Sequence, residues 1–394
     1  MTLDIPREYC LLGLRFNRLI DGFVDAYFGA EALRAQVAAE LLPDPRNLAR
    51  RAKELRTELP SAGLAPARAD YLDGQLAALE VSGRKLAGDE IGFVEEVEGY
   101  FQVRPDYGDQ AAYAEAHIAL EELLPGEGSL GDRYRAYRSA DELPAARVRD
   151  VVLAFSSALR DRVRATYGLP DAETVEYEIV GDRPWSGFNY YKGNFASVVA
   201  INSDLPMRAA DVPSLVAHES YPGHHTEHCR KERLLVDEAR HAEQTIFLVN
   251  TPECLMAEGL ADLGLRATVG AGWGAWATEV YADLGIRFDG ERVEQIGKAL
   301  LPLATVRQDV VMMLHDRGAS DDEAVAYLAR WSLLPDERAR KALTFYRDPL
   351  WRAYTSTYVE GYRLLRGWLD AGGDFLRLLD EPLTPRAIAA ELAA

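Results

Sequence analysis

The sequence is poor in cysteine and has no long apolar stretch. Its three cysteines, Cys10, Cys229 and Cys254, form no pattern and leave at least one thiol unpaired, which suits a reducing compartment. No window approaches the roughly 18 apolar residues of a membrane span. The first residues are polar and do not resemble a targeting segment. We therefore expect a cytoplasmic protein that has no membrane partner.

Basic residues are also in the minority. The chain has 63 acidic and 44 basic residues, and its formal net charge is −19. Such a charge argues against nucleic acid as a partner. The 394 residues, 48% of them hydrophobic, are ample for a sizeable core. Nothing in the pattern indicates an oligomeric state.

The spacing of apolar residues is mostly helical. It predicts helices over 9–60, with breaks at the prolines, and further helices over 65–82 and 141–167. Alternating residues predict strands over 173–180 and 195–202. We therefore expect a mainly α fold with a small β-sheet. The residues between the strands are predicted to form a loop over 181–187 and a connection over 189–194.

Histidines are concentrated in one short stretch. Four of the seven lie within His218–His228, directly after an apolar helical segment. Neutral imidazole is the commonest metal ligand, and an unpaired buried imidazole is costly. In the usual zinc-hydrolase helix, His-Glu is followed after two residues by a second His, and the Glu acts as general base. His218 and Glu219 begin that pattern, but Pro222 occupies the place of the second His.

The second ligand therefore has alternatives. Pro222 and Gly223 predict a bulge or kink in the helix, and a two-residue bulge brings His224 beside His218. His225 is the rival, because it lies two turns from His218 on the same side of an unbroken helix. His224 with His228 has the plain i, i+4 spacing. We favour His218 and His224, with Glu219 between them.

A second helical stretch supplies two carboxylates. Glu258 and Asp262 lie four residues apart on an otherwise apolar segment, where like charges repel unless a cation neutralises them. Glu258 is the candidate third ligand. Asp262 is the candidate acceptor for the spare N–H of His218. Two histidines and one glutamate leave a fourth position open for water, which is typical of catalytic zinc sites.

Other polar residues are candidates for contacts with a substrate. Tyr354, Tyr358 and Tyr362 recur every four residues in a helix predicted to begin at Pro349, and this spacing is also typical of a packing stripe. Arg307 and His315 share one face of a helix predicted over 301–317. Asn202 and Asn189 flank the second strand and are alternatively capping residues. An edge strand in this place can pair with an extended peptide.

The stretch His-Glu-x-x-Pro-Gly-His-His, at 218–225, resembles the signature of the bacterial family called domain of unknown function 885, which is grouped with the gluzincin-type zinc peptidases. The segment 257–262 is similar to that family's Glu-Gly segment. The weaker motifs at 311–315 with 323–328, and at 358–361, also resemble parts of that family. The resemblance covers about residues 185–365. It implies a mostly helical fold with a deep cleft, a small sheet and a zincin-like, metallopeptidase-like site.

Together these patterns predict a helical N-terminal region, 1–170, and a metal-binding catalytic region, 171–394, packed as one unit. The expected activity is a zinc-dependent hydrolase of short peptides or other small amides, with one zinc per chain; Mn²⁺ and Co²⁺ also suit such ligands. Glu219 is the predicted base. Tyr358 or His315 is expected to stabilise the oxyanion, and Arg307 to hold a substrate carboxylate. The alternatives are a metal-binding protein without catalysis and a helical scaffold whose histidines bind nothing.

Overall fold

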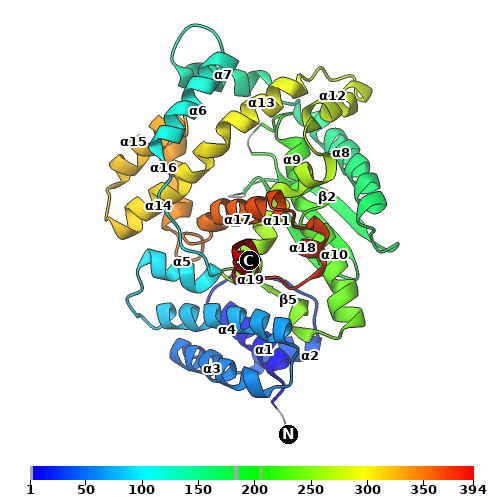
Figure 1. Cartoon of the computed structure of the whole chain (residues 1–394), viewed down its shortest axis with the longest axis vertical. Helices are drawn as coiled ribbons and strands as arrows, with labels where there is room; N and C mark the ends of the chain where they lie inside the picture. Colours follow the sequence, from blue (N-terminus) through cyan, green and yellow to red (C-terminus); the bar gives the residue numbers. More distant parts are fainter. Residues whose placement is uncertain (1–2, 182–184, 205) are drawn as a thin grey trace.

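The computed structural model describes residues 3–181, 185–204 and 206–394. It is mainly helical with two small sheets, which confirms the predicted fold class (Figure 1). The middle of the predicted loop, residues 182–184, lies outside the described residues. Within the described ranges, no helix is long and apolar enough to cross a membrane.

The N-terminal part is a layer of helices at the bottom of Figure 1. The prediction of helices throughout 9–60 is wrong at one place, because the strand β1 (Val24–Tyr27) interrupts them. It pairs antiparallel with β5 (Ile246–Leu248), which lies more than 200 residues further along the chain. Such a distant partner leaves no periodic signal around β1. The helices are α1 (Ile5–Asn17), α2 (Glu31–Ala39), α3 (Pro45–Glu58), the short η1 (Leu59–Ser61) and α4 (Pro66–Leu86).

A second group of helices packs around its own apolar core, largely in the upper left of Figure 1. One of its helices begins with a reciprocal cap that can be read from the sequence. The Ser320 side chain accepts from the N–H of Glu323, and the Glu323 side chain accepts from the N–H of Ser320. The group comprises α6 (Gln110–Leu123), α7 (Leu130–Ala140), α13 (Gly290–Leu300), η4 (Leu301–Thr305), α14 (Val306–Asp316), α15 (Asp321–Trp331) and α16 (Asp336–Arg347). Helix α5 (Phe93–Phe101) belongs to a separate apolar cluster that also includes Leu255 and Val311.

The larger sheet has the strand order β2-β4-β3. Strands β2 (Thr174–Val180) and β4 (Ala196–Asn202) were predicted and run parallel. Strand β3 (Gly187–Gly193) was predicted as a connection, but it pairs antiparallel with β4. One face of the sheet packs against α8 (Ala145–Thr166) and α9 (Val212–Glu219), with α12 (Trp273–Asp283) beside them.

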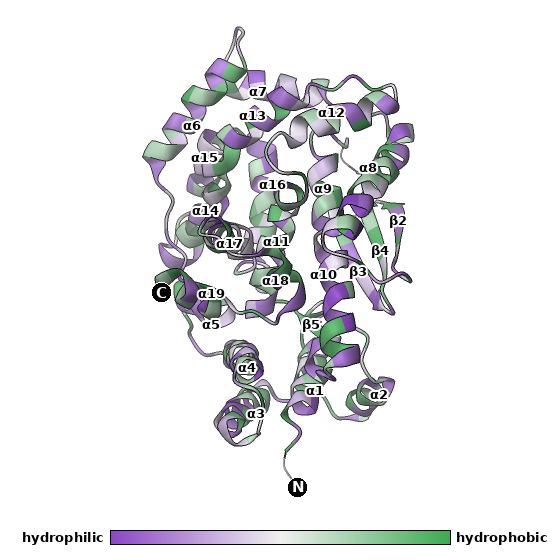
Figure 2. Cartoon of the chain, turned by 45° about the vertical axis from the view of Figure 1, so that its right-hand side comes forward, coloured by the Kyte–Doolittle hydropathy of each residue, from purple (hydrophilic) through white to green (hydrophobic). Residues whose placement is uncertain are grey.

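Helix α11 (Pro252–Val269) runs through the middle of the molecule, where Figure 2 shows it largely in green. It packs against α9, the π-helix η5 (Thr357–Gly361) and α17 (Tyr362–Asp370). A Cβ at Gly259 would lie 2.6 Å from the backbone of Gly361, so only glycine allows α11 and η5 to approach this closely.

The C-terminal helices differ in part from the prediction. The helix expected from Pro349 begins later, because turns occupy the residues up to Tyr354. The last helix has Thr384 as its N-cap, with the Thr384 side chain accepting from the N–H of Ala387. The remaining helices are α10 (His224–Lys231), the π-helix η2 (Glu232–Glu238), η3 (Ala242–Thr245), α18 (Phe375–Asp380) and α19 (Pro385–Ala393).

Apolar contacts cross residue 170, where the sequence suggested a division. Phe155 and Leu159 of α8 share one buried cluster with Val199 of β4 and Val216 of α9. The two regions of the chain therefore pack on a shared core.

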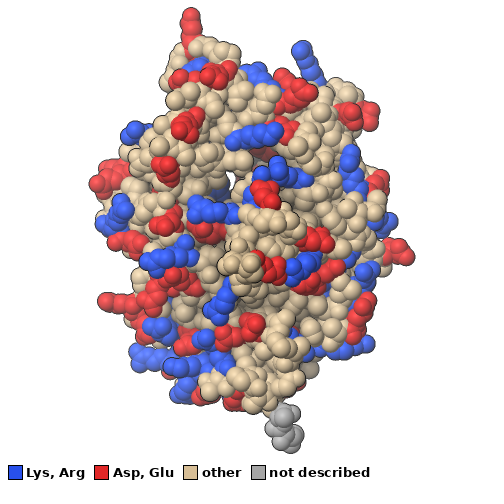
Figure 3. All heavy atoms as spheres, viewed as in Figure 1, with Lys and Arg blue, Asp and Glu red and all other residues tan. Residues whose placement is uncertain are grey.

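On the face in Figure 3, acidic and basic side chains are interspersed, and the surface is hollowed near its centre, with a narrow gap at the bottom of the hollow.

Candidate metal centre

The histidine-rich stretch folds as two helices with a break between them. Helix α9 ends at Glu219, and α10 begins at His224. A Cβ at Gly223 would lie 1.8 Å from the carbonyl oxygen of His218, so the chain can pass there only with glycine. A bulge or kink of one helix was expected at Pro222 and Gly223, and the structure has a complete break there between two helices.

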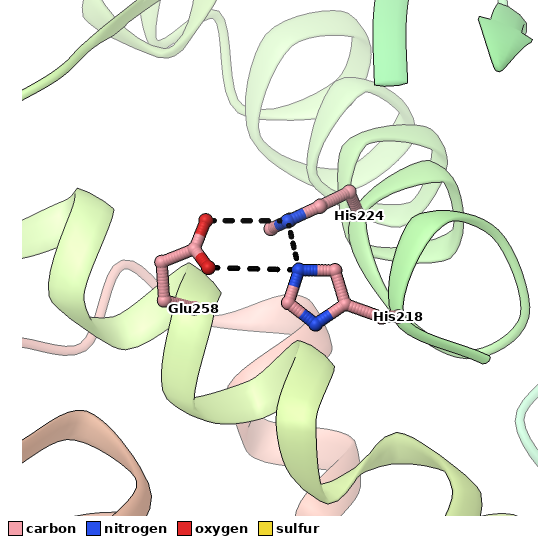
Figure 4. A group of neighbouring side chains, drawn as sticks. All are labelled: His218, His224 and Glu258. Carbon is pink, nitrogen blue, oxygen red and sulfur yellow. Dashed lines mark hydrogen bonds and ion pairs between the residues drawn. The ribbon is translucent and has the colours of Figure 1, made fainter. Parts of the chain in front are cut away.

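The break nevertheless brings together the histidine pair that the sequence favoured. The rings of His218 and His224 are 4.7 Å apart and almost perpendicular. Their Nε2 atoms are 3.2 Å apart. The Glu258 carboxylate, on the neighbouring α11, lies 3.5 Å from Nε2 of His218 and 3.4 Å from Nε2 of His224 (Figure 4). In the described part of the chain, these three residues alone form a cluster of potential metal ligands.

The geometry of the cluster fits a tetrahedral divalent ion. Zinc–nitrogen and zinc–oxygen distances near 2.0–2.1 Å place neighbouring ligand atoms about 3.3 Å apart. The three observed separations lie close to that value. In addition, Oε2 of Glu258 is buried and accepts no hydrogen bond from any described residue. A buried carboxylate oxygen without a donor is costly unless a cation binds it.

Asp262 holds the ring of His218 in place. Its Oδ1 lies 2.9 Å from Nδ1 of His218, as the spacing on α11 predicted. A proton on Nδ1 leaves the Nε2 lone pair facing His224 and Glu258. Burial would lower the pKa of His218, but the Asp262 hydrogen bond and the charge of Glu258 raise that pKa to about 10. The acidic surroundings therefore favour a positive charge at this position, from a proton or from a metal ion.

Glu219 follows the first histidine and is buried beside the cluster. Its backbone carbonyl accepts a hydrogen bond of 2.7 Å from Nδ2 of Asn189 on β3, which fixes the end of α9 against the sheet. Burial raises the pKa of the Glu219 carboxyl, although the charges of His218 and His224 oppose this. A carboxyl group with a raised pKa is suited to accept a proton and to release it again.

The tyrosines divide between two roles. The Tyr354 hydroxyl donates a 2.7 Å hydrogen bond to Oε1 of Glu258, a contact that the aromatic spacing did not reveal. Tyr358 stacks edge-on against Tyr354. Burial and then the charges of Glu258 and Asp262 raise the pKa of Tyr358, so its phenol stays protonated and able to donate. Tyr358 lies in η5, and π-helical turns are frequent at functional sites.

Arg307 lies beside Tyr358, whereas Asn202 caps the end of β4. The Arg307 guanidinium is exposed and stands 5.6 Å from the centroid of the Tyr358 ring. Within the described residues, no carboxylate forms an ion pair with it, so it is available to an anion. Oδ1 of Asn202 accepts from the N–H of Asp204 at the end of β4, the capping geometry that was the alternative role for this residue.

Two other candidates have different partners. His225, the rival ligand, is fully buried, with Nε2 against Glu173 and Nδ1 against Ser197, so neither nitrogen is free for a metal. His315 is the second candidate for the oxyanion. Its Nε2 lies 2.8 Å from the carbonyl oxygen of Tyr346, and its ring stacks on Phe93. His228 packs flat against Tyr191 and makes no pair with His224 in the cluster.

One acidic residue of the centre was missed. Asp25 of β1 interacts electrostatically with His224, Glu258 and Glu219. The residues around it form a short strand with no motif, and its neighbours in the centre lie about 200 residues away in the sequence. No signal in the sequence could have found it.

The comparisons with known proteins relate this chain to solved structures only. No family model and no curated protein matches it. A "putative lipoprotein" of Colwellia psychrerythraea has the same fold, with a TM-score of 0.52 and 14% identity over 92% of this chain and 62% of that protein. A "putative lipoprotein of unknown function" from Shewanella oneidensis has a TM-score of 0.55 and 12% identity, over 99% of this chain and 82% of that protein. This chain thus spans less than two thirds of the Colwellia protein, and the likeness shows the fold alone.

Proposed function

We propose that this protein is a metal-dependent hydrolase with a zincin-like site, and that its substrates are short peptides. The observation that carries the proposal is the meeting of Nε2 of His218, Nε2 of His224 and the Glu258 carboxylate within ligand distances of one another. Asp262 and Tyr354 hold two of the three ligands in place. The resemblance of the 218–225 stretch to a zinc-peptidase-like family points to the same class.

The residues of the chain have separate parts in the proposed reaction. A divalent ion such as zinc, when bound, lowers the pKa of a coordinated water and polarises a carbonyl group. Glu219 accepts a proton from the attacking water and transfers it to the leaving amine. The protonated phenol of Tyr358 donates to the developing oxyanion. Arg307, beside Tyr358, is available to a substrate carboxylate.

The first test combines metal content with turnover. We expect about one zinc ion per chain when protein without a His tag is analysed by mass spectrometry. His224→Ala and Glu258→Ala should lose the metal, because each removes a ligand. His225→Ala is the matched control on the same helix and should keep it, provided that it remains folded.

Glu219→Gln separates catalysis from binding. This variant should keep its zinc and lose activity on a peptide library by about 10²- to 10⁴-fold, because the base is gone. If the zinc-loaded wild type cleaves no peptide, the alternative of a metal-binding protein without catalysis is supported. A wild type that takes up no metal would contradict the whole proposal.

A further inference from the structure

Asp25 reaches the candidate centre through an irregularity in β1. Val24 pairs with Leu248 and Ala26 pairs with Phe247, so Asp25 is the extra residue of a β-bulge. A bulge redirects the side chain of the inserted residue and is frequent beside active sites. Strand β5, the partner of β1, is followed directly by α11, which carries Glu258. The N-terminal layer therefore contributes one side chain to a site that otherwise belongs to residues after 218.

The Asp25 carboxyl group is close enough to the centre to interact with its charged groups. It interacts electrostatically with His224, Glu258 and Glu219, and with Cys254, one helical turn before Glu258. Asp25 as a whole residue is partly buried. Among the described residues, none donates a hydrogen bond to it or forms an ion pair with it. Burial raises the pKa of Asp25 to about 7, against the opposing charge of His224. A carboxylate in these surroundings is stabilised by an incoming cation.

The charges of the centre indicate which kind of cation this is. Four carboxylates belong to the centre: Glu219, Glu258, Asp262 and Asp25. A divalent ion held by His218, His224 and Glu258 would balance two of them, which leaves negative charge for a further cation. A second metal ion fits poorly, because in the described chain Asp25 belongs to no cluster of three ligands. A single carboxylate is enough to bind an ammonium group.

We propose that Asp25 binds the free α-ammonium group of the substrate, so that the enzyme acts on short peptides with an unblocked amino terminus. This inference rests on the proposed function and adds to it the substrate class. Asp25 is accordingly a specificity-determining residue, while Glu219 and the metal ligands perform the chemistry.

The test compares peptides with and without the positive charge. Zinc-loaded full-length protein is incubated with an equimolar tetrapeptide library and with the same library after N-acetylation, and initial rates are measured by mass spectrometry. Wild type should cleave the free peptides about 10- to 100-fold faster, the range expected for one charge-assisted hydrogen bond. In Asp25→Asn this ratio should fall to about one through a higher KM for the free peptides. Asp21→Asn, an exposed position just before β1, makes the same charge change and should keep the preference.

Each outcome decides a different question. Zinc content and circular dichroism show whether Asp25→Asn is folded. The comparison of free and N-acetylated peptides with wild type does not depend on any variant. Equal rates on the two libraries in wild type, or a preference that persists in a folded Asp25→Asn, would overturn the role of Asp25 and leave the hydrolase intact. If zinc-loaded wild type cleaves neither library, the hydrolase proposal fails and the ammonium site fails with it.

Discussion

His218 and His225 lie seven residues apart, but their ring nitrogens meet different partners. Nδ1 of His218 faces Asp262, and its Nε2 faces the cluster. Both nitrogens of His225 are engaged by buried groups of the sheet region. Burial lowers the pKa of His225, and the nearby Glu173 opposes this only in part. A histidine can bind a metal only through a nitrogen that nothing else occupies, so the partners decide which histidine is a ligand.

The Asp262 carboxylate gives a prediction at this scale. Asp262→Ala removes the acceptor that fixes the ring of His218, and we expect the zinc affinity to fall about 10- to 100-fold. Competition with a fluorescent chelator measures this directly. Asp283→Ala, an exposed acidic position on α12, is the matched control and should bind zinc like wild type. An unchanged affinity in Asp262→Ala would show that the 2.9 Å contact does not tune the ligand.

At the scale of the elements, the centre depends on the break between α9 and α10. An unbroken helix would carry His224 past His218, whereas the break turns the chain so that the two rings meet. The turn is tight, because the N–H of Gly223 donates to the carbonyl of Ala217 at 2.8 Å. The same crowding excludes any side chain at position 223. The glycine at position 223 is therefore as necessary to the pair as the histidines.

Gly223→Ala tests this requirement. The added Cβ would clash with the backbone of His218, so we expect a loss of about 3 kcal/mol or more in the free energy of unfolding, together with the loss of zinc. Urea denaturation and metal analysis measure the two effects. Gly297→Ala on α13, where a Cβ meets nothing within 4 Å, is the control. It should be neutral or up to about 1 kcal/mol more stable, because alanine favours helix. A stable, zinc-binding Gly223→Ala would contradict the geometry of the break.

Sequence patterns predicted the parts of the site that lie on regular helices. Glu258 and Asp262 share a helical face at spacing four, and the structure places both beside His218. Tyr354 was not predicted as the partner of Glu258, because turns and a π-helix replace the expected regular helix there. Asp25 lies on a bulge whose position depends on pairing with β5. The periodicity of apolar residues reflects local structure only, so it cannot predict contacts made by irregular or distant segments.

At the scale of the whole molecule, one buried carboxylate joins segments that the sequence keeps apart. Glu173, just before β2, accepts hydrogen bonds from Arg164 of α8 at 3.0 Å and from the Tyr221 hydroxyl at 2.8 Å. Arg160 and His225 contact the same carboxylate. This group links α8, the sheet and the break before α10. The region before residue 170 therefore supports the candidate centre electrostatically as well as through the shared core.

The Glu173 carboxylate makes the stability of the fold depend on pH. Burial would raise its pKa, but the hydrogen bonds from His225, Arg160 and Tyr221 lower that pKa from 4.5 to about 2. Between these values the unfolded chain binds more protons than the folded one, so stability rises with pH. The contribution is complete above about pH 4.5 and is lost as the pH falls towards 2. A shift of this size corresponds to at most about 3 kcal/mol, less the screening of the partly exposed arginines.

Glu173→Gln isolates this contribution from the other acidic groups. Urea unfolding of metal-free protein, followed between pH 6 and 2.5, should show a steep loss of stability in wild type and a shallower one in the variant, which starts from a lower stability at pH 6. The curves should approach each other at the acid end, where most of the contribution of the Glu173 carboxylate is lost. Glu178→Gln, an exposed position on β2, should follow wild type throughout. Parallel curves for wild type and Glu173→Gln would show that the buried carboxylate is not what acid removes, and that the link between α8 and α10 depends on packing alone.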